Sequence, residues 1–269
     1  MPEGDTVWLA ARNLHSALAG QTLIRTDFRV PPLATTDLTG RRVLGVVPRG
    51  KHLLTRIAGG LTLHTHFRMD GSWHLYRPGE RWRGGPVSDV RVVLETPDRV
   101  AVGYRLPVVE LVDTDQEDSV VGHLGPDLLD DGWDAYLLAE AVRRLGARPD
   151  REVRLALLDQ TVVAGLGNLY TNELCFLRGM SPWLRVGAVP SGGLQPVVAL
   201  GRRLLLANRD TSAQVTTGDG RRGRQHWVFE RTRQPCRRCG TTILSAEQGE
   251  APRRRLTYWC PSCQPGLPS

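Results

Sequence analysis

Four cysteines near the C-terminus constrain the fold of this chain more than any other feature of its sequence. They read Cys236-x2-Cys239-x20-Cys260-x2-Cys263, the spacing of a four-cysteine zinc site built on two knuckles and a hairpin. Four thiolates complete the tetrahedral coordination of zinc and leave no open position for a substrate. We therefore expect a structural zinc ion held by a C-terminal hairpin.

The net positive charge of the chain lies in the same region. Residues 220–269 hold ten arginines and three glutamates, a net charge of +7, and the charge of the whole chain is also +7. The other 219 residues therefore balance, with 25 basic and 25 acidic side chains. A compact basic module beside a neutral body is typical of a nucleic-acid contact, although a solvated basic tail would have the same composition.

Composition and segment lengths argue against a membrane protein. No apolar run approaches the roughly 18 residues needed to span a bilayer, and the N-terminus, Met-Pro-Glu-Gly-Asp, is acidic rather than signal-like. We expect a cytoplasmic monomer, in which two disulfides are disfavoured. At 269 residues with 41% apolar content, the chain is long enough for more than one domain.

The sequence pattern changes at about residue 119. Before it, Asp5 can cap a helix over Thr6–Ala19, and short apolar runs separated by Gly, Pro and Asp follow. These runs predict a β-sandwich or barrel-like domain with strands Leu23–Val30, Val43–Val47, His52–Ile57, Leu61–His66, Val90–Glu95, Val100–Tyr104 and Val108–Val112. The later periodicity predicts helices Asp134–Leu145, Arg151–Val163, Asn168–Arg178 and Leu194–Asn208. Cys175 falls in the third of these helices and is predicted to be buried there.

Two glycines precede the third predicted helix, in Gly165-Leu166-Gly167-Asn168. They permit a tight turn with close approach of another backbone. Asn168 can cap the helix, whose exposed amides would form an anion site. An ordinary helix cap without a ligand explains the same residues.

Lys51 is the only lysine, because Lys and Arg together number 35 and the other 34 are all arginine. Arginine serves at least as well for surface charge or phosphate contact, but only lysine readily loses its proton and takes part in chemistry. Gly50-Lys51-His52 therefore suggests that an amine is required where a predicted strand opens. Alternatively, the composition favours arginine in general, and Lys51 is the one lysine that remains by chance, without a special role.

The N-terminus offers a second amine. Methionine before proline is usually removed, which leaves Pro2 with a free secondary amine. An α-amino group titrates near about 8 and a lysine near about 10.4, so the terminal amine holds more free base at neutral pH. Condensed with a sugar aldehyde it gives an iminium that acidifies the neighbouring C–H and permits elimination. The adjacent Glu3 is placed for proton transfer.

These residues carry a family resemblance. The chain resembles the formamidopyrimidine-DNA glycosylase and endonuclease VIII family in motifs that span nearly its whole length in the same order. The motifs are Pro2-Glu3-Gly4, the Arg49–Leu54 strand, Leu157–Gln160 followed by Ala164–Asn168, and the four-cysteine finger. The resemblance implies an α+β multidomain protein with DNA bound between its two halves. Its parts would be an N-terminal β-sandwich with a leading helix (residues 1–119), a helix-two-turn-helix domain (120–222) and a zinc-finger hairpin (223–269).

The resemblance also implies a bifunctional DNA glycosylase and AP lyase of base excision repair that cleaves by β,δ-elimination. Pro2 would be the Schiff-base nucleophile, Glu3 the acid/base that helps to open the deoxyribose, and Lys51 the cationic amine near the lesion-side phosphate. Arg255 matches the family's finger arginine, and both it and Asn168 would grip backbone phosphates. Such contacts supply affinity without reading the base sequence. The expected partner is DNA with oxidised bases or abasic sites.

The segment Arg68-Met69-Asp70-Gly71 matches the family's void-filling loop. Reaching a base inside a duplex requires flipping it out, and an apolar side chain can fill the space that it leaves. Met69 is the candidate wedge, with Arg68 beside it. A plain turn between two strands is the alternative.

Two differences from the formamidopyrimidine glycosylases indicate the branch of the family. Formamidopyrimidine glycosylases carry an Arg-Phe wedge on a later loop, whereas this chain reads Arg105-Leu106-Pro107 with no aromatic residue there. The connection from Asn208 to the finger is also short for a base-capping loop. Both features favour the endonuclease VIII branch and oxidised pyrimidines. Thr6 and Asp70 depart from the family pattern, so 8-oxoguanine specificity stays as an alternative. A non-catalytic damaged-DNA binder, which would use the same finger and helix-turn without amine chemistry, is a separate alternative.

Overall fold

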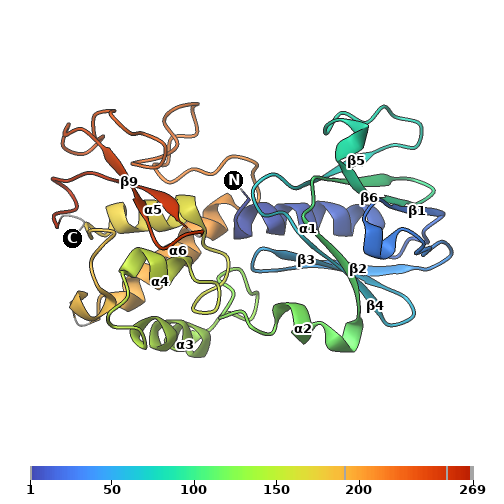
Figure 1. Cartoon of the computed structure of the whole chain (residues 1–269), viewed down its shortest axis with the longest axis horizontal. Coiled ribbons are helices and arrows are strands. Elements are labelled where there is room, and N and C mark those ends of the chain that lie inside the picture. Colours follow the sequence, from blue (N-terminus) through green and yellow to red (C-terminus); the bar gives the residue numbers. More distant parts are fainter. Residues whose placement is uncertain (1, 191, 253, 267–269) are drawn as a thin grey trace. The chain divides into compact units, whose positions relative to one another are not determined.

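The structure is a computed structural model that describes residues 2–190, 192–252 and 254–266. The chain divides into two compact units, Met1–His123 and Leu124–Ser269. Figure 1 shows the first unit built mainly of strands, and the second built of helices followed by a hairpin. The division falls four residues after the expected end of the sandwich domain, at residue 119.

Unit 1 begins with a long helix and continues in antiparallel strands. Its helices and strands are α1 Gly4–Leu18, β1 Arg25–Phe28, β2 Val43–Arg49, β3 His52–Ile57, β4 Leu61–His66, β5 Ser72–Tyr76, β6 Val90–Glu95, β7 Val100–Tyr104, β8 Val108–Asp113 and the short α2 Asp118–Val121. Three-residue 3₁₀ turns lie at Pro31–Leu33, Val87–Asp89 and Thr114–Gln116.

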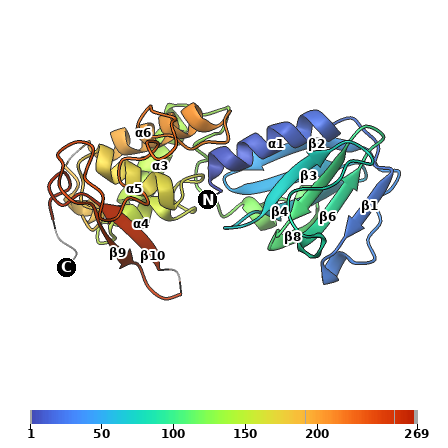
Figure 2. The same ribbon diagram turned by 90° about the horizontal axis from the view of Figure 1, so that it is seen from above.

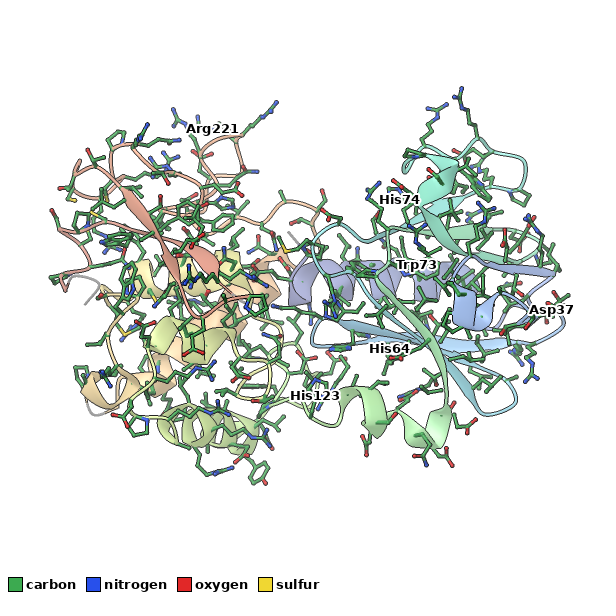
Figure 3. All side chains as sticks on the ribbon, viewed as in Figure 1. Asp37, His64, Trp73, His74, His123 and Arg221 are labelled. Carbon is green, nitrogen blue, oxygen red and sulfur yellow. The ribbon has the colours of Figure 1, made fainter. Side chains whose placement is uncertain are left out.

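Two four-stranded sheets form a sandwich in the described part of unit 1. One has the strand order β2-β3-β4-β8 and the other β1-β6-β7-β5. α1 lies along the sandwich (Figure 2), and the shared core includes Val7 and Leu14 of α1 with Leu53, Leu63 and Leu94 of the sheets. Trp73 of β5 donates from Nε1 to Oγ1 of Thr65 in β4 at 3.3 Å, which ties the two sheets together (Figure 3). The predicted β-sandwich with a leading helix is confirmed.

The leading helix starts earlier than its sequence indicates. α1 begins at Gly4, and its N-cap residue is Glu3, whose backbone is extended. Asp5 lies inside the first turn, where Oδ1 accepts a hydrogen bond from the amide of Thr6 at 2.8 Å. The predicted Asp5 cap was therefore wrong, and the helix follows Pro2 and Glu3 directly.

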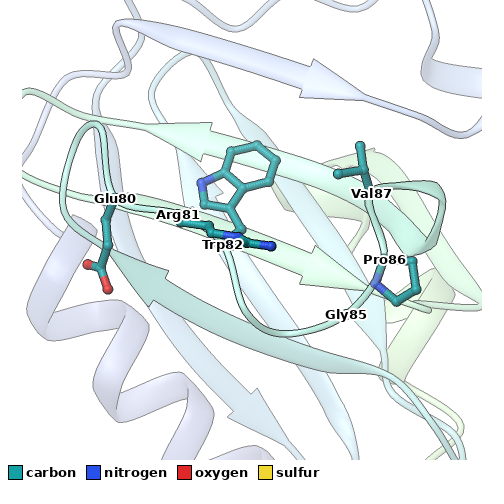
Figure 4. A pocket seen from close by; sticks show the side chains of 6 residues that line it. All are labelled: Glu80, Arg81, Trp82, Gly85, Pro86 and Val87. Atoms are coloured by element: carbon teal, nitrogen blue, oxygen red, sulfur yellow. The ribbon is translucent and has the colours of Figure 1, made fainter.

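The segment after β4 also differs from the sequence analysis. β5 was not predicted, because Asp70-Gly71 indicates a turn and Ser-Trp-His-Leu-Tyr has no Val, Ile or Thr, although its Trp and Tyr are also common in strands. Beyond β5 the chain folds over the outer face of its sheet, where Trp82 stacks on Tyr76 with ring centroids 6.4 Å apart. Figure 4 shows the open hollow of about 390 Å³ that this loop forms between Glu80 and Val87.

Unit 2 is helical up to its C-terminal hairpin. Its helices and strands are α3 Ala135–Gly146, α4 Val153–Leu158, α5 Asn168–Leu177, α6 Leu194–Asn208, β9 Leu244–Gln248 and β10 Arg255–Trp259, with a 3₁₀ turn at Val186–Ala188. The predicted helix Arg151–Val163 was too long. α4 ends at Leu158 because the carboxylate of Asp159 instead accepts hydrogen bonds from the Thr161 amide at 3.0 Å and from Arg151 at 2.6 Å.

The hairpin of β9 and β10 packs on α5 within unit 2. The amide of Tyr258 in β10 donates to Oδ1 of Asn172 in α5 at 2.8 Å. Glu173, also in α5, is fully buried and accepts hydrogen bonds from the backbone amides of Trp227, Val228 and Phe229. The segment that leads into the hairpin is therefore fixed to the same helix as the hairpin itself.

The helical domain (120–222) and the finger (223–269) remain a proposed subdivision, since both fall in unit 2 apart from residues 120–123. In the part of the chain that the structure describes, every helix is too short or too polar to cross a membrane.

Candidate active site

Pro2 and Glu3 precede α1 directly. Glu3 is completely buried, and its backbone carbonyl accepts a hydrogen bond from the amide of Val7 at 3.1 Å. Pro2 is half-buried, and Met1 lies outside the described residues. The candidate amine of Pro2 and the buried carboxyl group of Glu3 thus belong to consecutive residues at the start of α1.

Lys51 lies in a two-residue turn between β2 and β3, directly before the start of β3 at His52. Arg49 pairs with His52 across this turn, and Gly50 has a φ of 57°, a left-handed conformation that favours glycine. Figures 1 and 2 both show the tip of this hairpin beside the beginning of α1. Pro2, Glu3 and Lys51 therefore lie at the same end of unit 1.

Strand register places two further loops at that end. His66, the last residue of β4, pairs with His52 of β3 and with Val108, the first residue of β8. The chain leaves β4 and enters β8 on the side of the sheet where Lys51 lies. The loop after His66 contains the predicted void-filling residues.

The loop after β4 and the loop before β8 are joined by Arg105. Arg105 donates from Nε to the carbonyl of Asp70 at 3.2 Å and from Nη1 to Asp89 at 3.0 Å. Arg68 has a φ of 48° and the Met69 side chain is 54% exposed at the loop tip. An open hollow of about 460 Å³ lies between the two loops. Sequence reasoning noted Arg105 only for its missing aromatic neighbour.

Asn168 is placed differently from the prediction. It is the first residue of α5, the N-cap is Gly167, and no side chain caps the helix. Asn168 is nearly buried, and its carboxamide accepts a hydrogen bond from Nη2 of Arg154 and donates to the carbonyl of Leu256 at 3.1 Å. The predicted side-chain cap was wrong because these tertiary partners occupy the carboxamide.

Arg154 was missed by sequence reasoning. It is fully buried in α4, and Nη1 donates to Oε1 of Gln248 in β9 at 3.0 Å. Its single charge inside the apolar stretch Val-Arg-Leu-Ala-Leu-Leu was the available signal. Arg255, next to the Leu256 that Asn168 contacts, is exposed at the start of β10. The structure thus brings the two predicted phosphate-binding residues of unit 2 close together.

The four cysteines of the finger converge. Their sulfur atoms lie within 4.8 Å of one another, with Sγ–Sγ distances of 3.9 Å for Cys236–Cys263 and 3.5 Å for Cys239–Cys260 and Cys239–Cys263. Zinc–sulfur bonds of about 2.3 Å in a tetrahedron separate the sulfurs by about 3.8 Å, so the four thiolates fit zinc.

Four of the thiol pKa values differ from the ordinary range, and burial raises those of Cys260 and Cys263. Hydrogen bonds from the side chain and amide of Thr241 lower the pKa of Cys239 to about 6, which favours the metal-binding thiolate. Cys175 is buried in α5 as predicted, and burial raises its pKa to about 12. Cys175 is therefore held as an unreactive thiol.

Comparison with known proteins decides the family. The formamidopyrimidine-DNA glycosylase N-terminal domain matches residues 1–105, and the formamidopyrimidine-DNA glycosylase H2TH domain matches residues 124–188. A probable endonuclease 8 2 of Streptomyces coelicolor is 56% identical over 266 residues, covering 99% of this chain and 95% of its own length. The chain belongs to the formamidopyrimidine-DNA glycosylase and endonuclease VIII family.

Other family members extend the match. A protein of Mycolicibacterium smegmatis named DNA-(apurinic or apyrimidinic site) lyase Nei2 is 46% identical over 264 residues, 98% of this chain and 99% of its own length. The fold matches Lactococcus lactis formamidopyrimidine-DNA glycosylase bound to DNA with an AP site, at a TM-score of 0.80 and 24% identity over 98% of this chain and 100% of that chain. The resemblance inferred from the sequence motifs is confirmed.

Proposed function

We propose that this family member is a bifunctional DNA glycosylase and AP lyase of base excision repair with Pro2 as its nucleophile. One observation carries the assignment to Pro2: the residue directly precedes α1, beside the buried Glu3, at the end of unit 1 where Lys51 lies. The names of the relatives, endonuclease 8 and DNA-(apurinic or apyrimidinic site) lyase, support the reaction class.

The chemistry follows from a secondary amine beside a carboxylic acid. The Pro2 nitrogen attacks C1′ of the damaged nucleotide and forms an iminium after the base has left, while Glu3 donates a proton that opens the sugar ring. The iminium draws electrons from the C2′–H bond, so loss of that proton expels the 3′ phosphate. A second elimination expels the 5′ phosphate. Lys51 assists as a nearby amine whose charge attracts the lesion-side phosphate.

DNA binding would use residues of both units. Asn168 and Arg255 are proposed to hold backbone phosphates, and Arg255 also to support catalysis by fixing the DNA at the reacting sugar. Met69, exposed at its loop tip, is the proposed wedge for the space left by a flipped base, with Arg68 beside it. A structural zinc ion on the four cysteines would fix the finger that presents Arg255.

The proposed substrate is DNA with an oxidised pyrimidine or an abasic site. The loop between β7 and β8 reads Arg105-Leu106-Pro107, without an aromatic residue that could support an orphaned base opposite 8-oxoguanine. The endonuclease 8 names of the relatives agree with this choice. We also propose that the chain acts as a monomer in the bacterial cytoplasm.

Borohydride trapping tests the proposal. Wild type should form a covalent complex with DNA carrying thymine glycol, dihydrouracil or an abasic site, and less with 8-oxoguanine. A Pro2→Gly variant should trap much less, and a chain with an N-terminal extension left in place should trap none, because its terminal amine lies away from the site. Strongest trapping on 8-oxoguanine would overturn the lesion class. Equal trapping by the extended chain would overturn Pro2 as nucleophile.

A further inference from the structure

His52, His64 and Glu110 form a hydrogen-bonded line across three neighbouring strands of unit 1. Nδ1 of His52 lies 2.7 Å from Nε2 of His64, and Nδ1 of His64 lies 2.6 Å from Oε1 of Glu110. The residues belong to β3, β4 and β8. His64 pairs with Leu54 and with Glu110, and His52 lies two residues before Leu54 in β3, so all three side chains are on the same face of the sheet. Figure 3 marks His64 and His123 on this side of the sheet.

The line runs from the neighbourhood of Lys51 to solvent. His52 follows Lys51 directly in the chain, the His64 side chain is only 4% exposed, and the Glu110 side chain is 47% exposed. The rings of His66 and His123 flank His52 edge-on, with centroids 4.7 and 6.0 Å from its own. A buried imidazole therefore connects a residue beside the candidate amine with a carboxylate in contact with water.

Burial keeps His52 neutral, and the charges around it act in the same direction. Burial, followed by repulsion from His66, His64, His123 and Lys51, lowers the pKa of His52 to about 3. Burial and repulsion, first from Lys51, likewise lower the pKa of His66 to about 4. At neutral pH both rings are uncharged, and each has one donor and one acceptor nitrogen.

The partners determine which nitrogen carries each proton. The Glu110 carboxylate can only accept, so Nδ1 of His64 donates to it, and in the neutral tautomer Nε2 of His64 carries the lone pair. His52 then donates from Nδ1 to that lone pair, and its own Nε2 is an acceptor. Every member of the line is oriented to pass a proton towards Glu110.

We propose that His52, His64 and Glu110 form a proton relay that serves Lys51, exchanging its proton with solvent during the lyase reaction. The inference rests on the proposed function, in which Lys51 takes part as an amine. A proton arrives at Nε2 of His52, the Nδ1 proton of His52 passes to Nε2 of His64, and the Nδ1 proton of His64 passes to Glu110 and then to water. Each N–H bond that forms replaces one that breaks. Passage in the reverse direction restores both tautomers and returns a proton to Lys51.

A second polar network on the same sheet face supplies the matched control. Arg56 donates to Glu117 from Nε at 2.9 Å and from Nη2 at 2.8 Å, and Thr62 donates to Glu117 at 2.7 Å. Arg56 near the end of β3 pairs with Thr62 near the beginning of β4, at the end of these strands away from the Lys51 turn. Glu117→Gln therefore perturbs a comparable network without touching the proposed relay.

Two substitutions interrupt the relay differently. Glu110→Gln keeps an oxygen that accepts from His64 but cannot take up the proton, and its exposed position leaves folding intact. His64→Gln removes the central imidazole. We expect each to slow single-turnover strand cleavage of abasic DNA about 10-fold or more, with the roughly 10²–10⁴-fold contribution of a directly acting acid–base group as the upper range. Each should also raise the solvent deuterium isotope effect and alter the pH–rate profile, while the yield of trapped Schiff base stays at the wild-type level.

The outcomes separate the relay from the proposed function. Unchanged cleavage rates and isotope effects in Glu110→Gln would overturn the relay while leaving Pro2 chemistry intact. Equal losses in Glu110→Gln and Glu117→Gln, tracking their melting temperatures, would also overturn it, because the line would then be only structural. Absence of trapping in wild type would instead overturn the proposed function itself.

Discussion

Glu173→Gln is the substitution whose effect the structure defines most closely. Oε1 of Glu173 accepts the amides of Val228 and Phe229 at 2.8 and 2.9 Å, and Oε2 accepts the amide of Trp227 at 2.8 Å and the hydroxyl of Thr216. The carboxylate is fully buried and fixes the segment that leads into the finger to α5. Glutamine has nearly the same shape but replaces one acceptor oxygen with a donor group.

The orientation of the glutamine carboxamide determines how much stability the substitution removes. Its nitrogen would take the Oε2 position, since the Thr216 hydroxyl can turn and accept while the two amides at Oε1 cannot. The Trp227 amide then loses its partner, which costs about 1–3 kcal/mol, and the two bonds at Oε1 lose their charge assistance at about 1 kcal/mol each. The expected destabilisation is about 3–5 kcal/mol, equivalent to a decrease in Tm on the order of 10 °C.

Thermal unfolding followed by tryptophan fluorescence measures this loss, because Trp227 stacks on Phe176 with ring centroids 5.4 Å apart. Hydrogen exchange should show faster exchange of the amides of residues 227–229. Glu140→Gln is the control, since Glu140 pairs with Arg143 and Arg144 of its own helix and lies outside the segment that Glu173 fixes. A Glu173→Gln protein with the Tm of wild type and unchanged protection of those amides from hydrogen exchange would refute the reasoning.

Further outcomes follow from other sites. Chelation of zinc, or Cys239→Ser, should unfold the β9–β10 hairpin and remove DNA binding, as measured by metal content and near-UV circular dichroism. His52 has its pKa lowered from 6.5 to about 3 in the fold, so its contribution to stability is complete above about pH 6.5 and falls as the pH drops towards 3; His52→Asn should flatten that dependence in urea titrations. Arg154→Met should weaken binding of abasic-site DNA by releasing the Asn168 carboxamide, with little change in the trapping rate at saturating DNA. Lys51→Arg should retain DNA affinity but slow cleavage, because guanidinium does not exchange protons at neutral pH.

Short-range patterns predicted much of the fold. β3, β4, β6, β7 and α6 begin and end at the residues that periodicity and turn signals indicated. The errors occur where a side chain has a partner that sequence spacing cannot show. α4 ends early because Asp159 binds Arg151 and Thr161, and Asn168 fails to cap α5 because Arg154 and Leu256 occupy its carboxamide.

The candidate site also contains some residues that the sequence alone indicates and others that only the fold brings together. Pro2 and Lys51 could be proposed from sequence because amine chemistry restricts the residue type, so a proline in the second position and a single lysine are informative alone. His64 and Glu110 could not, because an imidazole and a carboxylate 46 residues apart acquire a joint role only when β4 and β8 become neighbours. Their short contact depends on register: a shift of one residue would turn Glu110 to the opposite face and leave His64 without its acceptor. The proposed reactive amines are thus encoded locally, whereas the groups proposed to exchange protons with Lys51 are brought together by the pairing of the strands.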